Sequence, residues 1–394
     1  MPPDQPIDAR ALARSGAEAL RLGDARKAHG FFEQVIAAGV ADAEVYIGLA
    51  QACRGLKEYA TAHLAVDKAL AVEPRNLRAL IMKGDHLAAE GDERAAASFY
   101  VAAMKAAPAP NRLPADLQRE LNRAQAQCAR YAAQFEAHLR DCLNAQGLVD
   151  RASSARFMRS FDILIGKRKI YYQQPQFYYF PELPQIQFYD RSGFPWLDRV
   201  EAATAQIRAE LIEVLEDSTE LKPYVQGDPR RPGYDPTGML NNPDWSAFYL
   251  WQAGKAVQPN AGRCPATLDA LRDVPLAAVK NRSPSILFSV LRPGARIPAH
   301  TGFVNTRLIC HLPLLIPNDC GLRVGNETRT PVEGKAWVFD DTMEHEAWNL
   351  SDRIRVILLF EIWRPELTEE ERTLVSAMFE AIDAYSGEKA LWTI

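Results

Sequence analysis

The chain has 394 residues and a mass of 44.0 kDa, which is enough for two or three domains. Hydrophobic residues make up 47% and charged residues 24%, a balance that excludes a wholly disordered chain. The formal net charge of −4 shows no basic excess, so we expect no nucleic-acid partner. Of the aromatic residues (16 Phe, 13 Tyr and 7 Trp), 8 fall within residues 1–150 and 28 after them, which predicts two differently built parts.

Targeting and redox signals are sparse. No apolar stretch approaches the ~18 residues that a transmembrane helix needs, so we expect no membrane span. The first residues lack the basic segment and apolar core of a signal peptide. The six cysteines show no CxxC spacing and are expected to be reduced thiols. These features together predict a cytoplasmic protein.

Residues 9–108 repeat with a period of 34 residues. Two positions of the repeat are small and one is large and apolar: Gly16, Ala50 and Gly84; Ala28, Ala62 and Ala96; Phe32, Val66 and Tyr100. Small residues let two helices approach closely, and proline ends a helix because it lacks an N–H donor. Pro74 and Pro108 are therefore expected to follow the second helix of their repeats. The pattern resembles the tetratricopeptide repeat, a helical hairpin.

We assign residues 1–110 to this array and residues 111–150 to a capping or linker helix, because apolar residues continue at helical spacing over 113–148. Gly23 and Gly91 fall at the hairpin turns, and Gly55 is expected to play the same part in its own repeat. The resemblance implies a concave peptide-binding groove that recruits a protein or peptide partner. A rigid scaffold or a dimerisation surface is the alternative.

Residues 151–394 show a different pattern. Residues 177–188 are rich in Pro and Tyr and predict an extended segment, and residues 200–215 predict one amphipathic helix. Five strands are predicted over residues 245–251, 286–291, 306–316, 335–339 and 354–363. Short strands separated by Gly, Pro and Asn turns favour a sandwich or a double-sheet jelly roll.

Three histidines, His300, His311 and His345, lie among these strands. Two imidazoles from separate strands can bind one divalent ion such as iron, zinc or copper, although a lone His is more often structural. Arg355 lies on a strand whose neighbours are all apolar, so a buried guanidinium there needs an anionic partner. That partner could be an acid-bearing cosubstrate or a carboxylate of the chain, Glu361 or Asp352.

The order of these residues resembles the aspartyl/asparaginyl β-hydroxylase family over about residues 175–370. The matching residues are Ser289, His300-Thr301-Gly302, Arg307, His311-Leu312, Asn326-Glu327-Thr328-Arg329, Phe339-Asp340-Asp341, Glu344-His345-Glu346, Trp348 and Arg355. The resemblance implies a double-stranded β-helix that uses Fe(II) and 2-oxoglutarate to hydroxylate the β-carbon of Asp or Asn in a peptide or protein. The expected fold is thus a tetratricopeptide array followed by a jelly-roll catalytic domain.

By this resemblance, His300 and His345 are the iron ligands, and Asp341 is an acidic residue beside them. Arg355 would pair with the distal carboxylate of 2-oxoglutarate, and the remaining cosubstrate contacts would come from Ser289, His311 and Arg307. No acid follows His300, and this absence is itself a mark of the family.

One departure from the family pattern is Ile309, which stands where a second arginine often lies. With Ile309 there, 2-oxoglutarate would bind more weakly or in another pose, which keeps open a non-catalytic, metal-binding adaptor with a peptide-binding repeat groove. Independently of Ile309, a hydroxylase of a small-molecule or lipid-derived acid is the other alternative.

Overall fold

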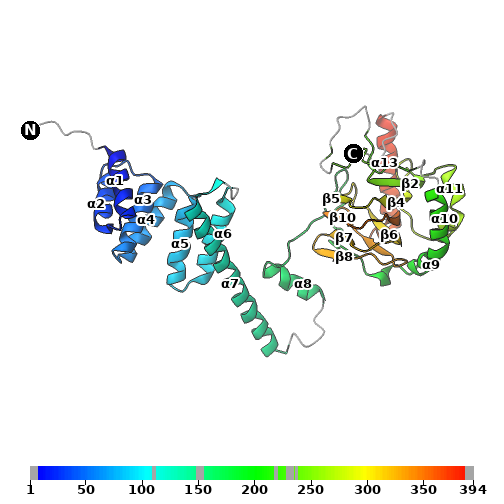
Figure 1. Ribbon diagram of the computed structural model, residues 1–394. Helices are drawn as coiled ribbons and strands as arrows, with labels where there is room; N and C mark the ends of the chain where they lie inside the picture. The colour runs from blue at the N-terminus through cyan, green and yellow to red at the C-terminus, as the bar shows by residue number, and fades with distance from the viewer. Residues whose placement is uncertain are drawn as a thin grey trace, which may run out of the picture. The chain divides into compact units, whose positions relative to one another are not determined.

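The computed structural model describes residues 8–108, 112–147, 155–216, 221–227, 235 and 238–386. The chain forms two compact units, Met1–Lys167 and Arg168–Ile394 (Figure 1). Two domain limits predicted from the sequence, near residues 110 and 150, lie outside the described residues.

The first unit is helical. Its helices are α1 (Ala9–Arg21), α2 (Ala25–Ala37), α3 (Ala43–Gly55), α4 (Tyr59–Val72), α5 (Leu77–Ala89), α6 (Glu93–Ala106), α7 (Ala115–Ala145) and α8 (Ala155–Leu164). The first six pack as three successive hairpins, and the long helix α7 packs against α6 (Figure 1). The predicted helical array is confirmed, with one hairpin in each 34-residue repeat.

Close helix approach explains the small residues of the repeat. A Cβ atom built on Gly16 or Gly48 would overlap the ring of Phe32, and one built on Gly84 would overlap the ring of Tyr100. Both rings are buried, at 3% and 1% exposure. Each aromatic ring therefore occupies the space that a side chain on the facing helix would need.

One prediction about the hairpin turns, the role of Gly55, was wrong. Gly23 (φ +79°) and Gly91 (φ +86°) adopt the left-handed conformation, but the equivalent residue of the middle repeat is Lys57, at φ +66°. Gly55 instead ends α3, where a Cβ atom would lie 2.8 Å from that of Ala25. Its role in the turn was predicted wrongly, because the reason for its small size is packing.

The second unit contains two antiparallel sheets and six helical segments among the described residues. The strands are β1 (Lys222–Pro223), β2 (Trp245–Gln252), β3 (Lys255–Ala256), β4 (Ile286–Leu291), β5 (Arg296–His300), β6 (Arg307–Leu315), β7 (Cys320–Val324), β8 (Glu327–Arg329), β9 (Trp337–Phe339), β10 (His345–Asn349) and β11 (Arg355–Trp363). The helices are η2 (Arg191–Gly193), α9 (Leu197–Ala202), α10 (Thr204–Glu216), α11 (Asn260–Arg263), α12 (Pro265–Ala270) and α13 (Glu369–Ser386).

The larger sheet has the order β1-β2-β4-β11-β6-β9, with β3 beside β2, and the smaller has the order β5-β10-β7-β8. All nine residues of the central strand β11 are buried, because both of its faces are covered. One face packs against α9 and α10 through apolar residues such as Leu197, Ile207 and Leu211. The other face packs against the smaller sheet, whose Ile297, Leu322 and Ala347 belong to a second core.

The predicted fold class, a helical array followed by an antiparallel β domain, is confirmed. The five predicted strands all occur in the larger sheet, whereas the four strands of the smaller sheet were not predicted. The predicted helix over residues 200–215 is two helices that break at Ala203. At the break, the Thr204 hydroxyl donates to the carbonyl oxygen of Glu201 (2.6 Å), a local bond that competes with the helical ladder.

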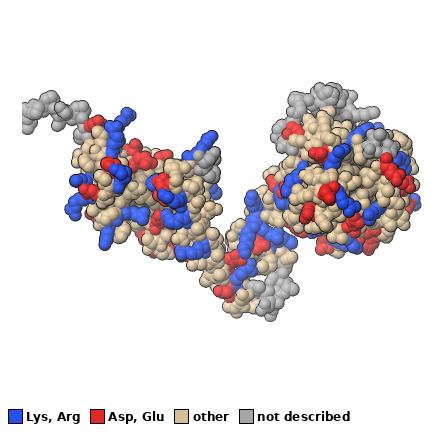
Figure 2. Space-filling model, in the orientation of Figure 1, with Lys and Arg blue, Asp and Glu red and all other residues tan. Residues whose placement is uncertain are grey.

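The surface carries both signs of charge. On the face drawn in Figure 2, Lys and Arg are interspersed with Asp and Glu over both units. Across the described residues, no helix combines the length and the apolar character needed to cross a bilayer. All six cysteines are free thiols, as the sequence predicted.

Candidate active site

A cavity between the two sheets contains all seven residues that the sequence singled out. They are Ser289, His300, Arg307, His311, Asp341, His345 and Arg355. His300 and His345 come from the smaller sheet, whereas Ser289, Arg307, His311 and Arg355 come from the larger one. The pairing of strands distant in the chain thus brings the predicted site together.

His300 ends β5 and His345 begins β10, and the two residues are direct partners in the antiparallel pairing. Their ring centroids lie 4.1 Å apart. In each ring, Nδ1 bonds the carbonyl oxygen two residues earlier, that of Pro298 (2.7 Å) or Met343 (3.0 Å). Because a carbonyl only accepts, Nδ1 carries the proton and Nε2 presents its lone pair.

Burial lowers the pKa of both histidines, to about 3 for His300 and to about 4 for His345. The proximity of His345 lowers the pKa of His300 further. Both imidazoles are therefore neutral at pH 7, which is the form that binds a metal ion. Two oriented, neutral imidazoles on paired strands fit a divalent transition metal such as iron.

In a site of two histidines and one carboxylate, the carboxylate that binds the metal would lie just after His300, and that position is Gly302 in this chain. A Cβ atom built on Gly302 would overlap the Asp341 carboxylate, so no larger residue fits there without displacing that group. The Gly302 N–H also donates to the backbone oxygen of Asp341 (2.7 Å). Asp341 thus fills the space that an acidic side chain at position 302 would have used.

Arg307 is engaged by two carboxylates of the chain. Its Nη1 lies 3.0 Å from an oxygen of Asp341, and its Nε lies 3.1 Å from an oxygen of Glu361. All three side chains are at least nine-tenths buried. The charge of Arg307 is therefore already balanced within the protein.

Arg355 differs sharply from Arg307. It is 1% exposed, and its Nε and Nη2 atoms have no hydrogen-bond partner in the part of the chain that the structure describes. Burial lowers the pKa of Arg355 to about 10, so it remains charged at pH 7. Glu361, one of its predicted partners, contacts Arg307 and the Ser285 N–H (2.8 Å), and Asp352, the other, is exposed. No ion pair of the described residues includes Arg355, which leaves a buried cation that faces the cavity.

Ser289 and His311 lie on the strands that flank Arg355. Ser289 is on β4 and His311 on β6, and both strands pair with β11. The Ser289 Oγ accepts a hydrogen bond from Trp245 Nε1 (3.0 Å), so its own proton can be donated into the cavity. The Nδ1 atom of His311 is buried and has no hydrogen-bond partner among the described residues. Burial, followed by the charge of Arg355, holds the pKa of His311 well below its usual value.

The cavity also contains residues that were given no role from the sequence. Tyr224 and Trp245 stack with ring centroids 4.0 Å apart, and Gln176 and Phe303 lie on the same cavity. Gln176 is held at the site because its side-chain amide donates to the Thr301 carbonyl oxygen (2.5 Å). Tyr224 directly follows β1, a strand of two residues that is too short to give a sequence pattern.

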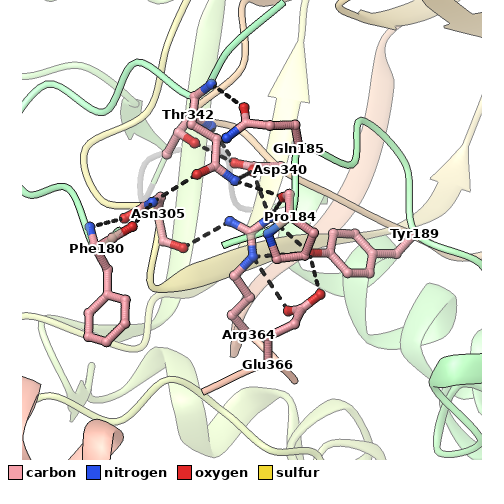
Figure 3. A network of polar contacts seen from close by, with 10 residues as sticks. Phe180, Pro184, Gln185, Tyr189, Asn305, Asp340, Thr342, Arg364 and Glu366 are labelled. Carbon is pink, nitrogen blue, oxygen red and sulfur yellow. Dashed lines mark hydrogen bonds and ion pairs between the residues drawn. The ribbon is translucent and has the colours of Figure 1, made fainter. Parts of the chain in front are cut away.

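Asp340 anchors the loop that carries Asp341 (Figure 3). One of its oxygens accepts from Arg364 (2.9 Å) and from the Gln173 amide (2.8 Å), and the other accepts from the Thr342 N–H (3.0 Å) and hydroxyl (2.5 Å). Asp340 and Arg364 are both 0% exposed. The buried pair therefore fixes the backbone on one side of Asp341.

Arg364 connects this network to the segment over residues 177–188 and to Tyr189, which follows the segment. It donates to the carbonyl oxygens of Asn305 (3.0 Å) and Pro184 (2.9 Å) and to the Tyr189 hydroxyl (2.8 Å) (Figure 3). The Asn305 side chain in turn bonds the backbone of Phe180. The segment is thereby attached to the loops that surround the cavity.

Residues 201–365 match the family model described as aspartyl/asparaginyl beta-hydroxylase. This span includes every residue of the two-histidine and arginine site. The domain belongs to the aspartyl/asparaginyl β-hydroxylase family. The N-terminal hairpins are tetratricopeptide repeats, as their period predicted.

Several curated members of the aspartyl/asparaginyl β-hydroxylase family and related hydroxylases are similar to this chain. The human aspartyl/asparaginyl beta-hydroxylase is 39% identical over 136 residues, 34% of this chain and 18% of that protein. The ornithine lipid ester-linked acyl 2-hydroxylase of Rhizobium tropici is 35% identical over 180 residues, 45% of this chain and 60% of that protein. The chain thus spans less than two thirds of these relatives.

The similar solved structures include tetratricopeptide domains. The tetratricopeptide domain of Arabidopsis OM64 covers 30% of this chain and 94% of its own, with 19% identity and a TM-score of 0.26. The second tetratricopeptide domain of Spaghetti (RPAP3), bound to an HSP90 peptide, covers 25% and 87%, with 19% identity and a TM-score of 0.25.

Proposed function

We propose that this protein is an Fe(II)- and 2-oxoglutarate-dependent hydroxylase. The observation that carries the proposal is Arg355, a buried cation that has no counter-ion among the described residues and lies in the cavity that holds the two histidines. A buried charge without a counter-ion lowers the stability of the folded protein. An anionic ligand that pairs with Arg355 would remove this cost.

The residues divide into two groups on opposite sheets. His300 and His345 would hold iron through Nε2, because their Nδ1 atoms are already bonded to the backbone. Arg355 would hold the distal carboxylate of 2-oxoglutarate, with the Ser289 hydroxyl as a second donor. When bound, iron would supply oxygen activation coupled to the conversion of 2-oxoglutarate to succinate. The apolar walls of the cavity would keep bulk water from the reacting groups.

The arginine anchor gives the direct test of this proposal. Replacing Arg355 by glutamine should weaken 2-oxoglutarate binding roughly 10- to 100-fold, because a hydrogen bond to a charged group contributes about 1.5–3 kcal/mol. Anaerobic titration of the Fe(II)-loaded protein with 2-oxoglutarate, followed by visible absorption, measures this change. Arg353→Gln, two residues away and exposed, is the matched control and should bind normally. Unchanged affinity in Arg355→Gln would place the anchor elsewhere.

Two substrate classes have separate support. Hydroxylation of the β-carbon of Asp or Asn in a peptide is supported by the family and by the 39% identity to the human enzyme. The helical repeats would then recruit the protein substrate. A cleft in the array, lined by Gln51, Arg54, Met82 and other residues, offers a surface for this purpose.

An uncharged acyl substrate is supported by the cavity itself. A substrate aspartate needs a cation, but Arg307 is occupied by Asp341 and Glu361, and Ile309 places an apolar side chain beside it. Among the described residues that line the cavity, Arg355 is then the one cation without a carboxylate, and the cosubstrate uses it. The similarity to an acyl 2-hydroxylase of Rhizobium tropici agrees with this class.

Variants at Ile309 distinguish the two substrate classes. If the substrate is an acyl chain, Ile309→Arg should lower acyl-dependent succinate release at least about tenfold, because a buried charge would enter an apolar wall. Ile309→Leu, which keeps the volume and polarity, should retain turnover. If the substrate is a peptide carboxylate, acyl compounds should not stimulate succinate release and Asp- or Asn-containing peptides should. Failure to bind 2-oxoglutarate at all would favour the non-catalytic adaptor.

A further inference from the structure

A second group of metal-binding side chains lies in the helical array. It consists of His29 on α2, Cys53 on α3 and Glu58 at the start of α4. One ligand atom from each residue lies within 4.8 Å of the other two. This group differs in chemistry from the two-histidine site of the β domain, because it combines an imidazole, a thiol and a carboxylate.

Glu58 departs from the repeat in a way that frees its carboxylate. At the equivalent positions of the other two repeats, Asp24 and Asp92 accept hydrogen bonds from the first turn of the helix that follows. Glu58 makes no such capping bond. Its carboxylate instead approaches His29, with Oε2 3.9 Å from Nε2.

His29 has a carboxylate beside each of its ring nitrogens. Its Nδ1 atom lies 3.4 Å from an oxygen of Glu33, one turn further along α2. A carboxylate beside one ring nitrogen favours the tautomer in which the other nitrogen presents a lone pair, the arrangement common to metal-bound histidines. Nε2 then faces Glu58.

Cys53 supplies the buried side of the group. Its side chain is 0% exposed, and no hydrogen bond of the described residues involves its sulfur. The neighbouring carboxylates, Glu33 and Glu58, make this part of the array electronegative, while no Lys or Arg of the described residues pairs with either. Thiolate, imidazole and carboxylate are the three ligand types that zinc accepts together.

We propose that His29, Cys53 and Glu58 form a zinc site, with a water molecule or Glu33 at the fourth position. The ligands come from the first hairpin and from both helices of the second. A bound ion would therefore tie two consecutive repeats together and stiffen the array. The site is independent of the function proposed for the β domain.

Cobalt(II) reports on this site because thiolate ligation gives an ultraviolet charge-transfer band that imidazole and carboxylate ligands do not give. The experiment uses the full chain carrying His300→Ala and His345→Ala, so that the site of the β domain does not compete. Titration should give the thiolate band with saturation at one equivalent, and zinc should bleach it. Zinc should also raise the unfolding temperature of the array, since it binds only the folded state.

Three variants in the same background decide the ligands. Cys53→Ser should abolish the band, and Glu58→Gln, at an exposed position that leaves the fold intact, should weaken cobalt binding at least about tenfold. Cys142→Ser is the matched control, because Cys142 lies 3.7 Å from His138 on α7 and offers the other Cys–His pair. The proposal would be overturned if the parent protein gave no thiolate band or if Glu58→Gln bound cobalt with unchanged affinity. If only Cys142→Ser lost the band, the proposal would also be wrong and the metal site would lie on α7.

Discussion

Replacing His345 by alanine is expected to abolish iron-dependent turnover and to weaken Fe(II) binding by at least about 100-fold. The remaining imidazole, His300, would be the one protein ligand left, and one neutral nitrogen holds a divalent ion poorly. Anaerobic calorimetry with Fe(II), or with Mn(II) as a substitute that does not oxidise, measures the affinity directly. Succinate release measures turnover in the same samples.

The matched control for this prediction is His138→Ala. His138 lies on the exposed surface of α7 in the helical unit, far from the cavity along the chain. Both variants are made in a Cys53→Ser background, which removes the thiol of the group proposed in the helical array. The control should bind iron as that background protein does. Retained iron affinity and turnover in His345→Ala would contradict the ligand assignment.

Breaking the buried pair of Arg364 and Asp340 should cost the β domain about 3–5 kcal/mol of unfolding free energy. Arg364→Met removes one partner and leaves the Asp340 carboxylate buried at 0% exposure without its cation. Urea unfolding monitored by tryptophan fluorescence isolates the effect, because all seven tryptophans follow residue 195 and none lies in the repeats. The expected result is a lower midpoint with an unchanged slope.

Two further variants test the cause of that loss. Adding Asp340→Asn to Arg364→Met should restore part of the stability, because no uncompensated charge then remains in the interior. Arg272→Met removes an arginine that is 70% exposed and paired with Asp269, and it should leave the unfolding free energy nearly unchanged. Equal destabilisation by Arg364→Met and Arg272→Met would show that burial of the pair is not the reason.

The larger sheet could be predicted because its strands are long and apolar. In β4, β6 and β11 nearly every residue is buried, so the sequence shows continuous runs of Val, Ile, Leu and Phe. The strands of the smaller sheet are three to five residues long, and buried, half-buried and exposed positions follow one another in them without a regular period. Such short segments lack a periodic signal, although β5 and β10 hold the two proposed iron ligands.

The roles of Arg307 and Arg355 also could not be told apart from the local sequence. Both Arg307 and Arg355 begin buried strands, and the local sequence treats them alike. The carboxylates that engage Arg307 are 34 and 54 positions away in the chain, at Asp341 and Glu361. Which arginine remains available for an anionic ligand therefore depends on contacts between distant segments.

By itself, the sequence determined the repeat array, the β domain and the set of residues that form its site. It did so because the 34-residue period, the apolar strands and the family motif are local properties of the chain. The tertiary structure alone decided that His300 and His345 face a buried, unpaired Arg355 across two sheets, and that Glu58 turns from its helix toward His29 and Cys53. Charge balance in the interior is a property of neighbours in space, and only folding brings those neighbours together.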